Sequence, residues 1–177
     1  MKIRNVAIIS LLSSLSIVLA QISHYLPVLG VHMLKLDFSD IPIFISTLAF
    51  GQTCGFLTLF VSSFIRAIFF SSAGIPGFLM RMIVSSTVVF LLSNLYKKNI
   101  KIWKIFVISI LVSTISKIIV NYFFWTKFFC MSKDWVLSIM VPIVIPHHVI
   151  RLIIELLVAF VIFKRLKLLN IKKEYGS

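Results

Sequence analysis

Several polar and ionisable residues interrupt the apolar segments of this sequence. They are Arg66, Arg81, Lys117, Asn121, His147, His148, Arg151 and Glu155. An ionisable side chain is costly inside a membrane-spanning helix, so by default it faces a cavity or a partner. His148, Arg151 and Glu155 follow i, i+3, i+7 spacing and share one helical face, while Lys117 and Asn121 are one turn apart. These residues are expected to converge on one pocket.

The balance of charge in these segments indicates the chemistry of a ligand. Four cations accompany a single acid, Glu155, which can neutralise only one of them. Arg151, one turn before Glu155, is its predicted partner. An excess of hydrogen-bond donors and positive charge remains, which predicts an electronegative or carbonyl-rich ligand. The best candidates to contact it are Asn121, His148 and Arg151.

Other roles are open for some of these residues. Arg66 and Arg81 would each also be explained by a side chain that extends to the outer lipid headgroups. Lys117 lies deeper, which favours the pocket over lipid. His147 is expected to have a structural role.

An enzymatic or metal-binding function is not favoured. His147 and His148 are adjacent, so their side chains point about 100° apart on a helix, and a zinc site needs about three ligands. No serine or cysteine is placed beside these histidines by sequence as an activated nucleophile. The motif GxxxxGK[ST] is missing from the sequence, so the chain is expected neither to hydrolyse ATP by itself nor to carry a cofactor.

The composition is that of an integral membrane protein. Of the 177 residues, 60% are hydrophobic, and the mean hydropathy is +1.09, whereas soluble domains are roughly 45–50% apolar. The net charge of +13 does not indicate nucleic-acid binding, because the lysines and arginines cluster between apolar runs. Cys54 and Cys130 fall on opposite sides of the predicted membrane, so no disulfide is expected.

The apolar runs occupy residues 5–23, 41–50, 54–70, 78–96, 102–125 and 141–163. Residues 41–65 carry no charge, so they form either one span or a hairpin broken at 51–55. Six spans place the basic clusters at 97–104 and 164–173 inside with the basic N-terminus, whereas five spans would place both clusters outside. The sequence therefore predicts an all-α plasma-membrane protein with six transmembrane helices, cytoplasmic termini and one domain over residues 1–177.

The first span also has features of a signal peptide, but cleavage would remove one of six spans, so retention is favoured. The second run is too short to cross alone, because ten helical residues cover about 15 Å of a roughly 30 Å hydrocarbon core. It either begins deep, sheltered by its neighbours, or extends through Gly51. Ser39 and Pro42 suit its start, and Asp37 and Asp40 are interpreted as cap and loop anchors.

Small residues recur along the first helix at steps of three and four residues. They begin with Ala7, Ser10 and Ser14 and continue with Ser16 and Ala20. Such spacing allows another helix to approach closely in lipid. The other helix is either part of the same bundle or a different membrane subunit that docks on Ala7, Ser10 and Ser14.

Short motifs along the whole chain resemble those of one family. They are SLLSS at 10–14, LKLDFSDIP at 34–42, FGQTCG at 50–55, NYF at 121–123 and IPHHVIRL at 145–152. Their order and spacing resemble the riboflavin-specific substrate-binding (S) components of energy-coupling-factor (ECF) vitamin transporters.

This resemblance implies a six-helix S component that captures riboflavin from outside in a pocket capped by the first loop. Asn121 carries over as a riboflavin contact, and Leu34 and Lys35 of the loop motif are further candidate contacts. The small-residue face of the first helix would dock on a transmembrane T component, which is coupled to two cytoplasmic ATPases that use ATP.

The chain departs from the riboflavin group at several positions. His148 and Arg151 stand where that group commonly has Asn and Lys, and Arg81 stands where it tends to have Asn. A different water-soluble vitamin or precursor is therefore the second hypothesis. A non-transport membrane enzyme or assembly protein is the alternative from another class.

Overall fold

The computed structural model describes residues 3–24, 37–70 and 74–175. Leu34 and Lys35 lie outside the described residues. The described residues form helices and contain no strand. The helices are α1 (Ile3–His24), α2 (Ile41–Phe50), α3 (Gln52–Phe69), α4 (Gly74–Lys97), α5 (Ile102–Lys127), α6 (Lys133–Ile139), a π-helical turn (Met140–Val144) and α7 (Ile145–Tyr175).

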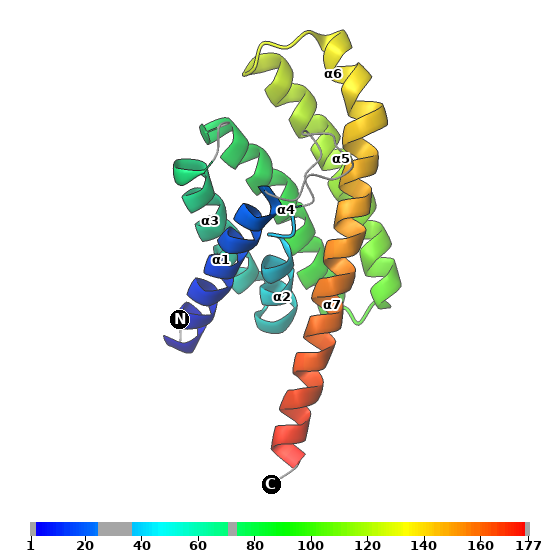
Figure 1. The fold of residues 1–177 in the computed structure, drawn as a ribbon. Helices are drawn as coiled ribbons and strands as arrows, with labels where there is room; N and C mark the ends of the chain where they lie inside the picture. The colour runs from blue at the N-terminus through cyan, green and yellow to red at the C-terminus, as the bar shows by residue number, and fades with distance from the viewer. Residues whose placement is uncertain (1–2, 25–36, 71–73, 176–177) are drawn as a thin grey trace.

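The helices form a bundle in which both termini lie at the same end (Figure 1). Four helices of the described part, α1, α3, α4 and α5, are long and apolar enough to cross a membrane. The sixth predicted span lies within the helical stretch from α6 to α7. Pro142 and Pro146 interrupt the backbone hydrogen bonds of this helical stretch because proline has no N–H to donate. The N–H of Ile145 donates to the carbonyl of Met140, five residues back.

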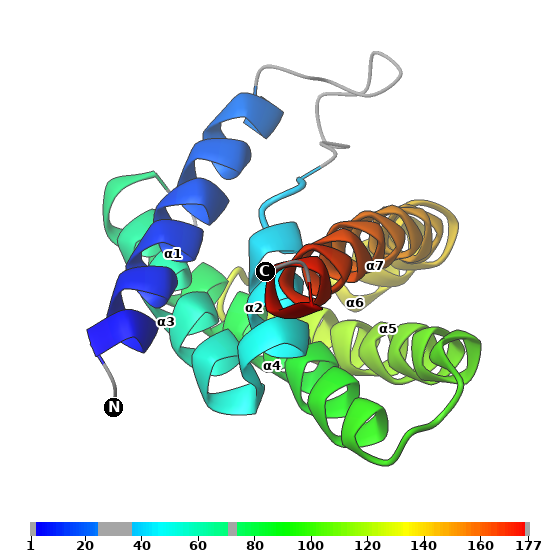
Figure 2. The ribbon, with the colours of Figure 1, turned by 90° about the horizontal axis from the view of Figure 1, so that it is seen from below.

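The short helix α2 is the centre of the bundle. It contacts α1, α3, α4 and α7, and Figure 2 shows it between α1 and α3 on one side and α7 on the other. All residues from Ile41 to Leu48 are buried. A helix of ten residues thus begins deep within its neighbours, as one of the two alternatives predicted. The hairpin prediction is confirmed, because α2 ends at Gly51, whose φ of 90° suits glycine.

The small residues of α1 divide between two faces. Ser16 and Ala20 are buried, and the Ser16 hydroxyl donates to the carbonyl of Ser39 at 2.6 Å. Ala7, Ser10 and Ser14 are exposed. Packing within the bundle therefore accounts for Ser16 and Ala20 only. The predicted docking residues remain on the outer surface of the bundle.

The crossing of α2 and α3 is close because Gly55 faces Thr47. A Cβ atom at position 55 would overlap the Thr47 side chain and would come within 3.1 Å of its Cα. Nearby hydroxyls also join the two helices, since Ser46 and Thr58 lie 3.1 Å apart.

We expect Gly55→Ala to lower stability by about 1–3 kcal/mol, because overpacking forces the helices apart. Thr53→Ala, at an exposed position two residues before Gly55, should leave stability unchanged. Thermal unfolding in detergent measures both. Equal midpoints for the two variants would contradict the close crossing.

Candidate functional site

A cavity of about 280 Å³ opens among α2, α3, α4, α5 and α7. Its lining comes from the start of α2, the C-terminal half of α3, the N-terminal part of α4, the C-terminal part of α5 and the N-terminal part of α7. Its lining includes five residues predicted from the sequence as ligand contacts, which are Arg81, Lys117, Asn121, His148 and Arg151.

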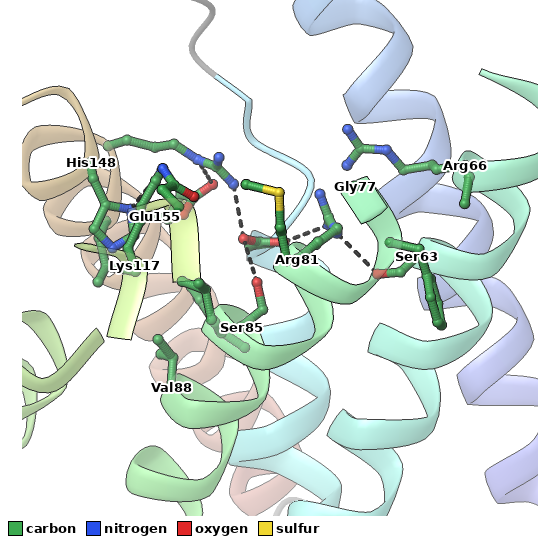
Figure 3. A pocket seen from close by; sticks show the side chains of 18 residues that line it. Ser63, Arg66, Gly77, Arg81, Ser85, Val88, Lys117, His148 and Glu155 are labelled. Atoms are coloured by element: carbon green, nitrogen blue, oxygen red, sulfur yellow. Dashed lines mark hydrogen bonds and ion pairs between the residues drawn. The ribbon is translucent and has the colours of Figure 1, made fainter. Parts of the chain in front are cut away.

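The cavity has two charged sides. Figure 3 shows Lys117, His148 and Glu155 together on one side and Arg66 near Ser63 on the other, with Arg81 between them. The first group comes from α5 and α7, the second comes from α3, and Arg81 between them belongs to α4. The predicted convergence on one pocket is therefore confirmed for all of these polar residues except His147, which does not line this cavity.

The carboxylate of Asp40 joins two arginines across the cavity. Its Oδ1 accepts from Arg81 Nη2, and its Oδ2 accepts from Arg151 Nη2 at 2.8 Å. The Ser85 hydroxyl also lies 3.3 Å from Oδ2. Asp40 is only 6% exposed, and its side chain makes no capping hydrogen bond to α2. Its interpretation as a helix cap was therefore wrong, because the two guanidinium groups take the carboxylate instead.

Asp37 pairs with Arg66 at the other side. Arg66 Nη2 donates to Asp37 Oδ2 at 3.0 Å, and Oδ1 accepts the backbone N–H of Ser39 at 3.0 Å. The loop-anchor interpretation of Asp37 is thus confirmed. Burial favours a higher pKa for Asp37, but the positive charges of Arg151, Arg81 and Arg66 outweigh it and hold the pKa well below its ordinary value. Asp37 is therefore ionised at neutral pH.

Arg66 and Arg81 are held by these acids rather than extended to headgroups. Arg66 Nη1 donates to the Ser39 hydroxyl at 2.7 Å. Arg81 Nε donates to Ser63 at 3.0 Å, and its Nη1 lies 3.5 Å from Asp37. Both guanidinium groups therefore belong to the wall of the cavity.

The predicted pair of Arg151 and Glu155 is confirmed. Arg151 Nε donates to Glu155 Oε1 at 2.9 Å, and Glu155 is 1% exposed. The predicted excess of positive charge needs correction, because Asp37 and Asp40 also reach the arginines. Three acids face four cations, so a single positive charge remains.

Of the four cations that line the first cavity, Lys117 has no carboxylate partner among the described residues. Its ammonium lies 3.3 Å from His148 Nδ1, and His148 Nε2 lies 3.4 Å from the Ser113 hydroxyl. An ammonium group can only donate, so Nδ1 accepts and the ring carries its proton on Nε2. His148 is thereby a neutral support for Lys117, and the remaining N–H groups of Lys117 donate to no other described residue.

A second cavity, of about 420 Å³, adjoins the first. Lys117 and Asn121 line both. Apart from His147, the remaining lining is aromatic and apolar, and it includes Trp125 and Trp135, whose ring centroids are 6.4 Å apart. His147, which was expected to be structural, also lines this second cavity. Asn121 is 6% exposed, and its amide makes no side-chain hydrogen bond to another described residue.

The sequence interpretation missed the place of Asp40 in the lining of this cavity. An acid next to the start of a helix was interpreted as a cap. The arginines that donate to Asp40 lie 41 and 111 residues further along the chain. Only the tertiary fold brings them together. Within the described ranges, no group of three His, Cys, Asp or Glu residues is placed to hold a metal ion.

Comparison with known proteins agrees with this geometry. The family model described as "ECF transporter, substrate-specific component" matches residues 4–163. The chain belongs to this family. It is 27% identical to the riboflavin transporter FmnP of Bacillus subtilis (strain 168), over 94% of each protein. It also matches a solved structure titled "Structure and mechanism of the S component of a bacterial ECF transporter", with a TM-score of 0.78, 25% identity, and coverage of 94% of this chain and 97% of the other.

Membership in the ECF S components confirms the predicted fold of six membrane helices and the location in the plasma membrane. The family supplies the substrate-specific component of a transporter, which is not an enzyme. The cavities described above are therefore candidates for the substrate site of this S component.

Arg151→Met should destabilise the protein by about 3–5 kcal/mol, because it leaves Glu155 buried without its partner. The double variant Arg151→Met/Glu155→Leu should recover much of this loss. Lys164→Met, at an exposed position of α7, serves as the control. Chemical unfolding in detergent would measure the free energy of unfolding of each variant. An Arg151→Met variant as stable as the control would show that the ion pair is not needed for stability.

Proposed function

We propose that this S component binds riboflavin and delivers it to an ECF importer. The observation that supports the proposal is that two cavities of different polarity share Lys117 and Asn121 in their linings. One cavity is lined by charged and hydroxyl side chains, and the other by tryptophan and aliphatic side chains. A ligand that fits both has a flat aromatic part and a polar part.

Riboflavin has this division, since a planar tricyclic ring carries a polyhydroxyl chain. Trp125 and Trp135 offer aromatic surfaces to the ring. Lys117 and Asn121 can bond to ring carbonyl groups at the junction, and the arginines and carboxylates of the first cavity suit the hydroxyls. The similarity to FmnP, named as a riboflavin transporter, supports the same ligand.

A different water-soluble vitamin or precursor is the second candidate. The observation in its favour is the number of guanidinium groups at the first cavity, where Arg66, Arg81 and Arg151 all stand. A ligand with an aromatic part and several hydrogen-bonding groups other than a ribityl chain would also suit this lining.

Delivery requires partners, which we propose are a transmembrane T component and two cytoplasmic ATPases. The proposed contact is the face of α1 formed by Ala7, Ser10 and Ser14, which is exposed. The hydroxyls of Ser10 and Ser14 bond to the carbonyls of Val6 and Ser10 in the same helix, at 3.0 and 2.9 Å. The face therefore presents small side chains whose donors are already satisfied, which suits close helix packing in lipid.

Titration of the purified protein with riboflavin, followed by flavin fluorescence, tests the proposed ligand. We expect saturable quenching. Lys117→Met should weaken binding by about tenfold or more, because the ligand loses a charge-assisted hydrogen bond. Lys133→Met, at an exposed position at the start of α6, should bind as the wild type does. No saturable quenching by the wild type would turn attention to the second candidate, which mass spectrometry of co-purified ligand can identify.

Docking through α1 predicts a separate effect. Ser10→Leu or Ser14→Leu should abolish co-purification with the T component while leaving ligand affinity intact, because a larger side chain prevents close approach. Ser86→Leu on α4 is the control. Normal assembly of the Ser10 and Ser14 variants would rule out this docking face.

A further inference from the structure

The first cavity contains cationic groups whose charge is almost fully compensated. Arg66, Arg81, Lys117 and Arg151 face Asp37, Asp40 and Glu155. Asp40 is the acid that compensates two of the arginines at once, one from α4 and one from α7. The two salt bridges use different oxygens of its carboxylate, so neither arginine displaces the other.

All three nitrogens of the Arg81 guanidinium and two of the three of Arg151 are already hydrogen-bonded within the protein. Arg81 uses Nε, Nη1 and Nη2 on Ser63, Asp37 and Asp40, and its Nη2 also reaches Ser39 at 3.0 Å. Arg151 uses Nε on Glu155 and Nη2 on Asp40. The planar guanidinium fork is the group that binds phosphate with two parallel hydrogen bonds. In this cavity Asp40 occupies the place that a phosphate would take between the two forks.

We infer that Asp40 determines the charge selectivity of the site, making it prefer a neutral polar ligand to the phosphate ester of that ligand. The inference rests on the proposed function for its natural ligand. A phosphate entering this cavity would meet the carboxylate of Asp40 and would have to break its salt bridges. Removal of the Asp40 charge would leave Arg81 and Arg151 facing each other as an anion site.

The test compares riboflavin with riboflavin 5′-phosphate as ligands of the purified protein. The wild type should bind riboflavin more tightly. In Asp40→Asn, the ratio of the two dissociation constants should shift toward the phosphate ester by about tenfold or more. Asp134→Asn makes the same change of charge at an exposed position on α6, and it should leave the ratio unchanged.

A second pair of variants separates charge from shape. Asp40→Asn/Arg81→Gln has the charge of the wild type, so its ratio should return toward the wild-type value. If Asp40→Asn fails to fold, Glu155→Gln removes the other carboxylate that holds Arg151, and it should shift the ratio in the same direction. An unchanged ratio in a folded variant of either kind would overturn the inference.

A readout without flavin distinguishes this inference from the proposed function. Inorganic phosphate should raise the melting temperature of Asp40→Asn over that in sodium chloride of equal ionic strength, because a bound anion stabilises the folded state. The wild type and Asp134→Asn should show no such difference. Failure of the wild type to bind riboflavin would refute the proposed ligand, whereas equal effects of phosphate on the wild type and Asp40→Asn would refute the role of Asp40.

Discussion

The bridge from Asp40 to Arg81 and Arg151 is the interaction on which the site depends. A buried carboxylate is unfavourable unless it is paired and hydrogen-bonded, and Asp40 has two guanidinium partners and the Ser85 hydroxyl. It stands immediately before α2, whose residues are buried among four other helices. The same carboxylate therefore links the start of the central helix to α4 and to α7 across the cavity.

This arrangement separates the groups that build the cavity from those that are available to a ligand. The arginines are bonded to acids and hydroxyls of the protein, while Lys117 is supported by a neutral His148. Lys117 and Asn121 also stand where the charged and the aromatic cavities meet. A ligand with unlike ends would be recognised at this junction, and the charged network would determine which polar end is accepted.

The sequence was sufficient to predict the fold and most of the wall of the cavity. Basic clusters and apolar runs predicted the number of helices, and helical spacing predicted the pair of Arg151 and Glu155, because both signals are local. The bridging role of Asp40 could not be predicted in this way, since its partners come from distant helices and the same residue suits a helix cap. Spacing alone also could not show which small residues of α1 are buried and which are exposed. The hairpin at Gly51, in contrast, could be predicted from the positions of the basic clusters, because only six spans place those clusters inside.

One ligand is expected to occupy both cavities and to be held where they meet. A structure of the protein with bound riboflavin would show whether this is so. We expect the flavin ring against Trp125 and Trp135, the ribityl chain toward Arg81, and hydrogen bonds from Lys117 and Asn121 at the junction. Electron density for riboflavin outside these two cavities, or bound riboflavin that touches neither Lys117 nor Asn121, would rule out this binding mode.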